Sequence, residues 1–222
     1  MIKVEDIEVW GWTHALRGMR NPMNSWNKSD TNITLTGSRV CAPRLHQTTS
    51  EYPHFGEADA KLIHSLVKCG TEHRKFLRQV FVAMDITAPL YWWKEFDTYK
   101  VGTTANSCST MHKIQSREFT EDMFSCEHLT TYSMKNLQST ISMLNLYRKL
   151  YNECHNKDYW WQMIQLLPTS YNQRRTVTMN YENVLAIIHQ RSGHKLDEWN
   201  DFVKVLTNLP GIDVVLGGEP QE

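Results

Sequence analysis

The sequence lacks an excess of charge of either sign, and it lacks any long apolar run. Its 222 residues include 24 Lys and Arg and 24 Asp and Glu, so the formal net charge is zero. General nucleic-acid binders normally carry a basic excess, so this balance excludes that class while leaving room for one local phosphate pocket. The first ten residues contain Lys3, Glu5 and Asp6 where a secretory signal would be apolar. We therefore expect a cytoplasmic protein without membrane contact.

The sequence also lacks the spacings of metal and disulfide sites. Five cysteines are odd in number and far apart, and no CxxC occurs, so free thiols are expected instead of a disulfide framework. Cys126 with His128, and Cys154 with His155, are too isolated to form a ligand set, and we expect no metal.

The common nucleotide and hydrolase motifs are absent as well. No GxGxxG follows a predicted strand, and neither GxxxxGK[ST] nor GxSxG occurs. A bound nucleotide must therefore be held by a less standard arrangement.

No repeat, low-complexity tract or Gly/Ser/Pro linker divides the chain, which predicts one domain over residues 1–222. Apolar periodicity and helix stop signals favour an α+β fold with mixed helices and a small, mainly antiparallel sheet. Strands are expected at 4–12, 79–87 and 174–180, and helices at 57–69, 130–155, 182–190 and 196–206. Residues 20–56, rich in Asn, Ser, Thr and Pro, are expected to be an irregular, loop-rich insertion, and the tail 217–222 to be frayed.

Residues 88–112 place Tyr91, Trp92 and Trp93 next to a polar run. Flat rings beside hydrogen-bond donors suit a flat, polar ligand such as a flavin or a base. The alternative is an interior strand or helix that runs into a surface helix. The predicted helix 130–155 carries one stripe of apolar and aromatic residues: Leu137, Ile141, Leu144, Tyr147 and Tyr151. Such a stripe is more typical of core or subunit interface than of a ligand site.

Several features follow one another in a distinctive order. A helix at 62–70 ends in Gly, a strand at 79–86 precedes Ala88-Pro89, and a strand after Leu167-Pro168 ends at Asn180. Arg191 comes eleven residues later, and His194 and Trp199 follow it. From about residue 15 to 206, this order resembles the flavin-dependent thymidylate synthases.

The family signature RHRxxSxNExSxR is eroded in this chain. Its Arg-His-Arg falls on Thr98-Tyr99-Lys100, its two Ser on Thr103 and Cys108, and its last Arg on Thr110. The Asn-Glu pair falls on Ala105-Asn106, unless a slip of one residue restores Asn106 as the Asn. An upstream Arg-Gln pair of the family falls on Lys94-Glu95.

The resemblance implies a homo-oligomer, a tetramer, that binds FAD between subunits and dUMP near the flavin ring. It further implies reductive methylation of dUMP to dTMP, with methylenetetrahydrofolate and NADPH as co-substrates. Arg191 would be catalytic and would bind substrate. The other implied cofactor contacts are Tyr99, Lys100, Asn180 and His73, and the other implied substrate contacts are Lys94, Glu95, Asn106 and Cys108.

Each of these residues also has a structural alternative. Arg191 suits a helix end, and Asn180 suits the turn at a strand end. Lys94 and Lys100 are often solvated, and Cys108 has no activating base in the sequence for attack on C6 of a pyrimidine. Arg174 and Arg175 are neighbours on a strand, so at most one of them enters a shared pocket.

Two other functions remain open. The altered signature positions favour a different C5 modification of a pyrimidine nucleotide, such as hydroxymethylation. The missing arginines favour a non-catalytic nucleotide- or protein-binding module.

Overall fold

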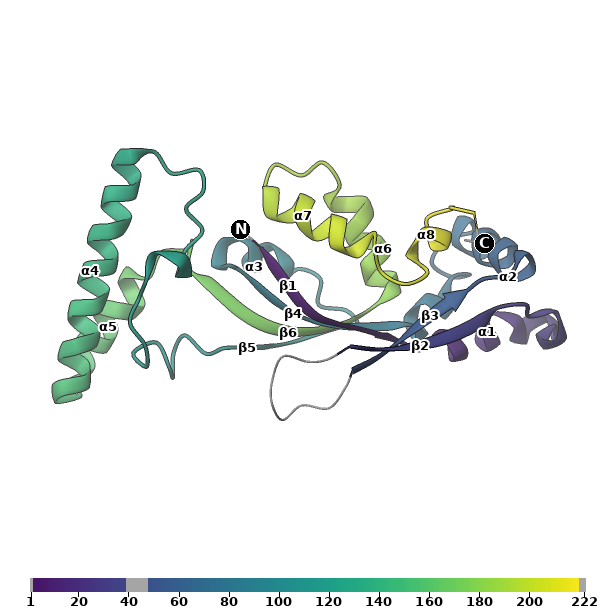
Figure 1. Cartoon of the computed structure of the whole chain (residues 1–222), viewed down its shortest axis with the longest axis horizontal. Coiled ribbons are helices and arrows are strands. Elements are labelled where there is room, and N and C mark those ends of the chain that lie inside the picture. The colour runs from purple at the N-terminus through teal and green to yellow at the C-terminus, as the bar shows by residue number, and fades with distance from the viewer. Residues whose placement is uncertain (1, 39–47, 220–222) are drawn as a thin grey trace. The chain divides into compact units, whose positions relative to one another are not determined.

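The computed structural model describes residues 2–38 and 48–219. Six strands and eight α-helices follow one another in the order shown in Figure 1. The strands are β1 (Lys3–Trp10), β2 (Asn32–Ser38), β3 (Thr48–His54), β4 (Phe81–Pro89), β5 (Thr103–Ser107) and β6 (Asn172–Asn180). The helices are α1 (Trp12–Arg20), α2 (Glu57–Lys68), α3 (Leu90–Phe96), α4 (Thr131–Cys154), α5 (Lys157–Leu166), α6 (Tyr181–Arg191), α7 (Asp197–Leu206) and α8 (Ile212–Val215).

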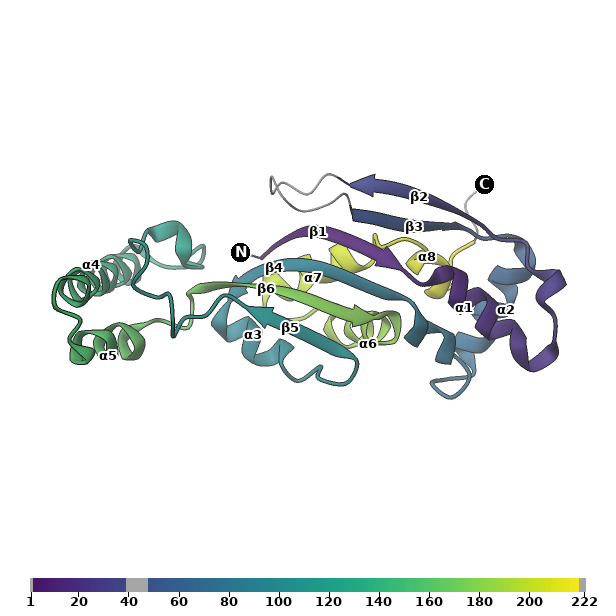
Figure 2. The same ribbon diagram turned by 90° about the horizontal axis from the view of Figure 1, so that it is seen from below.

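Two small sheets organise the strands. One has the order β1-β4-β6-β5, and the arrows of these neighbours alternate in direction (Figure 2). The other is the antiparallel pair β2 and β3, in which Asn32 pairs with His54 and Gly37 with Thr49. The predicted α+β class with a small, mainly antiparallel sheet is confirmed.

The chain divides by its contacts into two compact units. The first comprises Met1–Lys3, Ile86–Thr98 and Asn106–Arg175, and the second comprises Val4–Asp85, Tyr99–Ala105 and Thr176–Glu222. The prediction of one domain over residues 1–222 stays a prediction, because contacts within one chain do not establish whether each unit folds alone.

The first unit is built around α4 and α5, which lie side by side in both ribbon views (Figures 1 and 2). Thr130 caps α4 because its side chain accepts the Ser133 N–H, and α4 ends at His155 in a left-handed conformation. A cluster of buried apolar side chains packs beneath the two helices: Ile114, Phe119, Phe124, Leu137, Leu144 and Met163.

The second unit packs α6 and α7 on one face of its strand segments (Figure 1). Alternation along β4 buries Val82 and Met84, and alternation along β6 buries Val177 and Met179. Trp12, Tyr181 and Phe202 complete a core in which all three are fully buried.

A buried ion pair holds the N-terminal part of the second unit. The Arg20 guanidinium contacts one oxygen of Asp59 at 2.6 to 2.7 Å, and both side chains are almost wholly buried. The second carboxylate oxygen accepts hydrogen bonds from the hydroxyls of Ser29 and Thr31 and from two backbone N–H groups. Burial tends to raise the pKa of Asp59, but the hydrogen bonds from Thr31, Ser29 and Arg20 outweigh it and leave this pKa lowered.

Most of the predicted elements are confirmed, and their ends move by a few residues. The expected helices at 57–69, 130–155, 182–190 and 196–206 are α2, α4, α6 and α7, and the expected strands at 79–87 and 174–180 are β4 and β6. The predicted strand at 4–12 is too long, because β1 ends at Trp10 and α1 begins at Trp12. Gly11 makes this turn with a φ of 102°. Helices α1 and α5 were not predicted.

Two predictions for local structure were wrong. Residues 20–56 are not a wholly irregular insertion, because they contain β2 and β3. These strands are mostly exposed, and the only apolar alternation in them is the short one of Ile33 and Leu35 in β2. The polar run after α3 is a turn followed by β5 instead of a surface helix. Residues 39–47 and 220–222 of the predicted loop and frayed tail lie outside the described residues.

Trp92 and Trp93 do not form a ligand platform. Both side chains are completely buried in α3 and pack with Phe96 at ring-centroid distances of 4.9 to 5.3 Å. Rings enclosed by the chain's own atoms have no face left for a flavin or a base, so their role is in the core. The core alternative was the right one for these two rings.

Four of the five cysteines lie in the described residues, and all four are free thiols, as predicted: Cys69, Cys108, Cys126 and Cys154. Cys41 lies outside these residues. Within the described part of the chain, His, Cys, Asp and Glu side chains form no group of three placed to hold a metal. No helix in that part is long and apolar enough to cross a membrane.

Candidate functional site

Residues 99–103 of the second unit run along α6 and are held near both of its ends. At the start of α6, the Asn183 side-chain amide donates to the Val101 carbonyl at 2.7 Å and to the Thr103 hydroxyl at 3.0 Å. At its end, the Tyr99 hydroxyl donates to the Gln190 side chain at 3.0 Å. This segment is where the family's Arg-His-Arg falls, so α6 fixes its position.

Asn180 has a structural role at the N-terminus of α6. Its side-chain oxygen accepts the Asn183 N–H at 3.0 Å, which is an N-cap contact. Its amide nitrogen lies against Gly102, where an added Cβ would approach it to 2.5 Å, and Gly102 has a φ of 75°. The predicted turn role of Asn180 is therefore present, and a glycine at 102 is required on both counts.

The side chains of Tyr99, His194 and Trp199 contact the Arg191 guanidinium, and Gln190 joins them through the Tyr99 hydroxyl. We call these five residues the Arg191 cluster: Tyr99, Gln190, Arg191, His194 and Trp199. Arg191 Nε donates to the Tyr99 hydroxyl oxygen at 2.8 Å. The guanidinium carbon lies 4.4 Å from the centre of the Trp199 ring and 5.5 Å from that of Tyr99. Cation–π contact with one ring and a hydrogen bond to another group fix the plane of the guanidinium.

Trp199 is the rigid part of this cluster. It is fully buried, and its ring meets Tyr99 and Phe202 edge to face at about 6 Å. Helix α7 brings it there, because Asp197 and Glu198 occupy the favourable first turn and Trp199 falls on the buried face. The Arg191 side chain is thus supported by core packing instead of extending freely into solvent.

His194 joins the cluster through its ring. Nε2 lies 3.1 Å from Arg191 Nη1, and Nδ1 lies 3.1 Å from the Leu196 N–H. A neutral imidazole accepts a hydrogen bond at only one nitrogen, so its tautomer decides which of these contacts is a hydrogen bond. The Asn200 side chain donates to the His194 carbonyl at 2.8 Å and holds the loop between α6 and α7.

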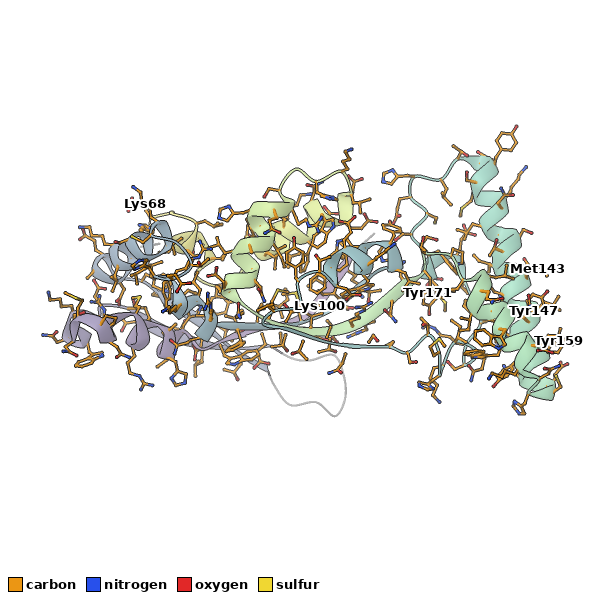
Figure 3. All side chains as sticks on the ribbon, turned by 180° about the vertical axis from the view of Figure 1, so that it is seen from behind. Lys68, Lys100, Met143, Tyr147, Tyr159 and Tyr171 are labelled. Atoms are coloured by element: carbon orange, nitrogen blue, oxygen red, sulfur yellow. The ribbon has the colours of Figure 1, made fainter. Side chains whose placement is uncertain are left out.

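The other predicted cofactor residues of this unit, His73 and Lys100, are exposed, and Lys100 is labelled in Figure 3. The backbone of His73 bonds to Gly70, while the neighbouring Arg74 makes a bidentate pair with Glu182 at 2.8 to 3.1 Å. Both partners are more than four-fifths buried, so the pair ties the turn after α2 to the start of α6.

The predicted substrate residues Lys94, Glu95, Asn106 and Cys108 belong to the first unit. Lys94 and Glu95 lie on α3, and only Glu95 is half-buried. Asn106 and Cys108 lie at and just after the end of β5 and are exposed. The Cys108 N–H donates to the Arg174 carbonyl at 2.9 Å, and the Gln173 side chain donates to the Cys108 carbonyl at 2.9 Å.

Arg174 and Arg175 lie on opposite faces of β6, as strand alternation predicted, with Arg174 exposed and Arg175 half-buried. Arg175 lies over the Trp93 ring at 4.2 Å and contacts the Asp97 carboxylate at 2.7 Å. Trp93 in turn donates to the Gln173 carbonyl at 2.9 Å. Arg175 thus has a complete set of partners within its own unit.

The described cavities lie elsewhere in the second unit. Two hollows, of about 240 and 370 Å³, share Tyr52, Asn208, Leu209 and Pro210. A third, of about 210 Å³, is lined in part by Arg17, Arg20 and Trp26. The Arg191 cluster consists of side chains held in place on α6, α7 and the 99–103 segment, together with His194 of the loop that joins the two helices.

Sequence reasoning brought together Tyr99 and Arg191 correctly, and it missed Gln190, Asn183 and Gly102. A signal for Asn183 was present, because an Asn at the predicted end of a strand and another polar residue three positions later are typical of a helix N-cap. Gly102 was a second signal, as an isolated glycine between polar residues. Gln190 carries no signal that distinguishes it from a solvated helix residue.

Comparison with solved structures finds a similar fold over almost the whole chain. One is Thymidylate Synthase X (ThyX) from Helicobacter pylori with FAD and dUMP, with a TM-score of 0.66, 17% identity, and 97% of each chain covered. A second is the flavin-dependent thymidylate synthase ThyX of Helicobacter pylori complexed with FAD and dUMP, with a TM-score of 0.64 and 16% identity. That match covers 98% of this chain and 100% of the other.

No protein-family model matches this sequence, and no curated protein does. The likeness therefore shows a ThyX-like fold, and at this identity it shows the fold alone. The fold expected from the order of features in the sequence is confirmed.

Proposed function

We propose that this protein is a flavin-dependent thymidylate synthase-like protein that binds FAD and a pyrimidine nucleotide, dUMP. The observation that carries this proposal is the Arg191 guanidinium, oriented by Trp199 and Tyr99, on a fold similar to two proteins whose structures hold FAD and dUMP. As an enzyme it would reductively methylate dUMP to dTMP, with methylenetetrahydrofolate and NADPH as co-substrates. We also propose a single domain over residues 1–222 and a homo-oligomer, a tetramer.

Arg191 is the residue that we propose for contact with the pyrimidine. A planar guanidinium presents parallel N–H groups to a carbonyl edge, and one held by packing loses little entropy when the ligand binds. Nε is bonded to Tyr99 and Nη1 lies 3.1 Å from His194 Nε2, so the orientation of the guanidinium is set before a ligand binds. In the catalytic step, this charge would stabilise negative charge that develops on the pyrimidine ring.

For the flavin, the chain offers one aromatic face and few charges. The half-buried Tyr99 ring would stack on the isoalloxazine, with Lys100, Asn180 and His73 as the remaining contacts. Tyr99 fits a flat, polar ring system. The exposed Lys100 would supply positive charge for the pyrophosphate, but without the bidentate hydrogen bonds that an arginine makes. The flavin, when bound, would supply the hydride of the reductive step.

We assign the nucleotide phosphate to two exposed side chains of the first unit. Lys94 would supply the positive charge and the Asn106 amide would donate a hydrogen bond, while the half-buried Glu95 carboxylate would accept a hydrogen bond from the sugar or base of the nucleotide. Because Lys lacks the bidentate geometry of Arg, we expect weak, salt-dependent phosphate binding. Cys108 would lie beside the pyrimidine without acting as a nucleophile.

The test is FAD binding to the purified full-length chain, followed by absorbance and fluorescence quenching, with dUMP then added. We expect FAD binding in the micromolar range and a dUMP response that Arg191→Ala reduces by roughly a hundredfold in affinity. Arg78→Ala, at an exposed arginine outside the cluster, is the matched control and is expected to behave as wild type. A well-folded protein that binds neither ligand would contradict the proposal.

A non-catalytic nucleotide- or protein-binding role is the second candidate. It is favoured by the internal bonds of Asn180 and Tyr99, since Asn180 caps α6 and the Tyr99 hydroxyl is bonded on both sides. FAD and dUMP binding without dTMP formation would support it. Another C5 modification would be distinguished by turnover of dUMP and methylenetetrahydrofolate that does not require NADPH.

A further inference from the structure

Helix α4 carries two stripes of side chains, and only one of them faces the core. Leu137 and Leu144 are buried, and Ile141, Tyr147 and Tyr151 pack against the same cluster. Tyr147 stacks on Tyr159 of α5 at 6.2 Å, and both are labelled in Figure 3. The stripe that the sequence assigned to core or subunit interface is therefore core.

On the opposite side of α4 lies a second stripe, which we call the outer stripe. Its residues are spaced alternately by four and three positions: Tyr132, Asn136, Ser139, Met143, Leu146 and Leu150. Tyr132 is 82% exposed, Leu146 47% and Met143 39%. The four-three alternation is the spacing of a helix seam that packs against a second helix.

The chemistry of the outer stripe suits a close helix contact. Residues 136–147 carry no charged side chain. Asn136 and Ser139 are small enough for another helix to approach closely, and Met143, Leu146 and Leu150 supply apolar contact. Charges stand toward the two ends. Lys135 lies near the start of α4, and Arg148, Lys149 and Glu153 lie in its last two turns; Lys135, Lys149 and Glu153 are exposed. A solvated helix face normally carries charges throughout its length.

We propose that the outer stripe of α4 packs antiparallel against the outer stripe of a second copy of this chain. In this register Met143 of one copy meets Leu146 of the other, and Ser139 meets Leu150. Lys135 then lies beside Glu153 of the other copy, twice in the dimer. A parallel pair would instead place Lys135 and Glu153 at opposite ends of the contact, so no pair of opposite charges would form between the copies, and the charges favour the antiparallel arrangement. The result is a two-fold, isologous contact.

This inference deepens the proposed self-association by naming the surface, and it is independent of flavin binding. Sedimentation velocity of the full-length chain is the first test, with Leu146→Glu compared with wild type. Leu146→Glu would place two carboxylates close together at the apolar centre of the contact. We therefore expect this variant to sediment as the next smaller oligomer. The corresponding dissociation constant should rise by about a hundredfold or more.

Leu35→Glu is the matched control, since Leu35 of β2 is 67% exposed and lies outside α4. It should assemble as wild type, and circular dichroism should show both variants folded. If Leu146→Glu assembled as well as wild type, the proposed α4 contact would be wrong, while the proposed oligomer would stand. A wild type that is monomeric at all concentrations would overturn both, whatever the flavin result.

The antiparallel register is tested by exchanging charges. Lys135→Glu alone, or Glu153→Lys alone, is expected to weaken the dimer by roughly three- to tenfold, because two attractive pairs become repulsive. The double variant should restore wild-type affinity. In a parallel dimer Lys135 and Glu153 of the two copies would not face each other, so unchanged affinity in the single variants would overturn the antiparallel arrangement.

Discussion

Two arginines in this protein lie over tryptophan rings at nearly the same distance, yet their surroundings differ. Arg175 lies 4.2 Å from the Trp93 ring, and Arg191 lies 4.4 Å from the Trp199 ring. The charge of Arg175 is matched by the Asp97 carboxylate at 2.7 Å. The printed contacts of Arg191 are of another kind, because they come from a phenol, an imidazole and an indole, which fix the plane of the guanidinium.

The difference teaches how to tell a structural arginine from a candidate ligand-binding one. An arginine that stacks on a ring and closes onto a carboxylate adds packing and a salt bridge to its own unit. An arginine held in plane between aromatic rings has a guanidinium that is already oriented when a ligand binds. The buried Arg20–Asp59 pair is the extreme case of the first type, because both charges are almost wholly removed from water.

The largest effect on stability is expected at the buried Arg20–Asp59 pair. Asp59→Asn removes the charge that Arg20 needs and leaves the guanidinium buried, so the free energy of unfolding should fall by about 3–5 kcal/mol at pH 7. Urea denaturation of both proteins at several pH values measures this difference in the free energy of unfolding.

The pH dependence gives this prediction a second readout. The Asp59 pKa is lowered in the folded protein, so the unfolded chain binds the proton more tightly. The stabilisation is therefore present above the unfolded pKa, about 3.9, and is lost as the pH falls through the folded value. The difference in the free energy of unfolding between wild type and Asp59→Asn should be constant from about pH 5 to 7 and should become smaller below about pH 4. A difference that stays constant in acid would contradict the lowered pKa.

Truncating the two ring-stacked arginines sharpens the comparison directly. Arg175→Ala and Arg191→Ala each remove a cation–π contact, and each should lower the free energy of unfolding by about 1–2 kcal/mol. Only Arg191→Ala should also weaken the dUMP response of the FAD-loaded protein. Chemical denaturation and dUMP titration of both variants measure these effects. An equal loss of dUMP affinity in Arg175→Ala would contradict the proposed difference between the two arginines.

A smaller effect is expected for Tyr99→Phe. The ring and its contact with Trp199 remain, while Arg191 Nε and Gln190 lose their shared hydroxyl. We expect a stability loss of about 1 kcal/mol and a dUMP affinity several-fold weaker, since the guanidinium is less firmly oriented. Thermal unfolding and isothermal titration measure the two. Unchanged affinity would mean that Trp199 alone sets the arginine's position.

The smallest effect is expected for Cys108→Ser. Cys108 is exposed, and its described hydrogen bonds use backbone atoms, which the substitution keeps. Stability should change by no more than about 0.5 kcal/mol, and dUMP affinity should stay as in wild type. If Cys108→Ser abolished turnover while binding stayed intact, the thiol would be a nucleophile after all.

The sequence predicted elements where one periodicity dominates. Val80, Val82, Met84 and Ile86 alternate because one face of β4 is core, and α6 was recognisable from its apolar spacing. The sequence did not reveal β2 and β3, which have little core to bury and show at most the short alternation of Ile33 and Leu35. It also did not reveal α1, where Trp10 and Trp12 continue an apolar run across the Gly11 turn. Within the candidate site, Arg191 and Tyr99 were implied by the family resemblance, while Gln190 was not.

By itself, the sequence determined the α+β class and the order of elements that the ThyX-like fold shares, because both follow from local periodicity and turn residues along the chain. Only the tertiary structure decided that Trp92 and Trp93 are core and that Tyr99 and Trp199 hold Arg191. The reason is physical: burial and hydrogen bonding depend on which segments meet in space, and Tyr99 and Arg191 are separated by 92 positions in sequence. A ring in a polar stretch looks the same in the sequence whether a ligand or the protein itself covers it.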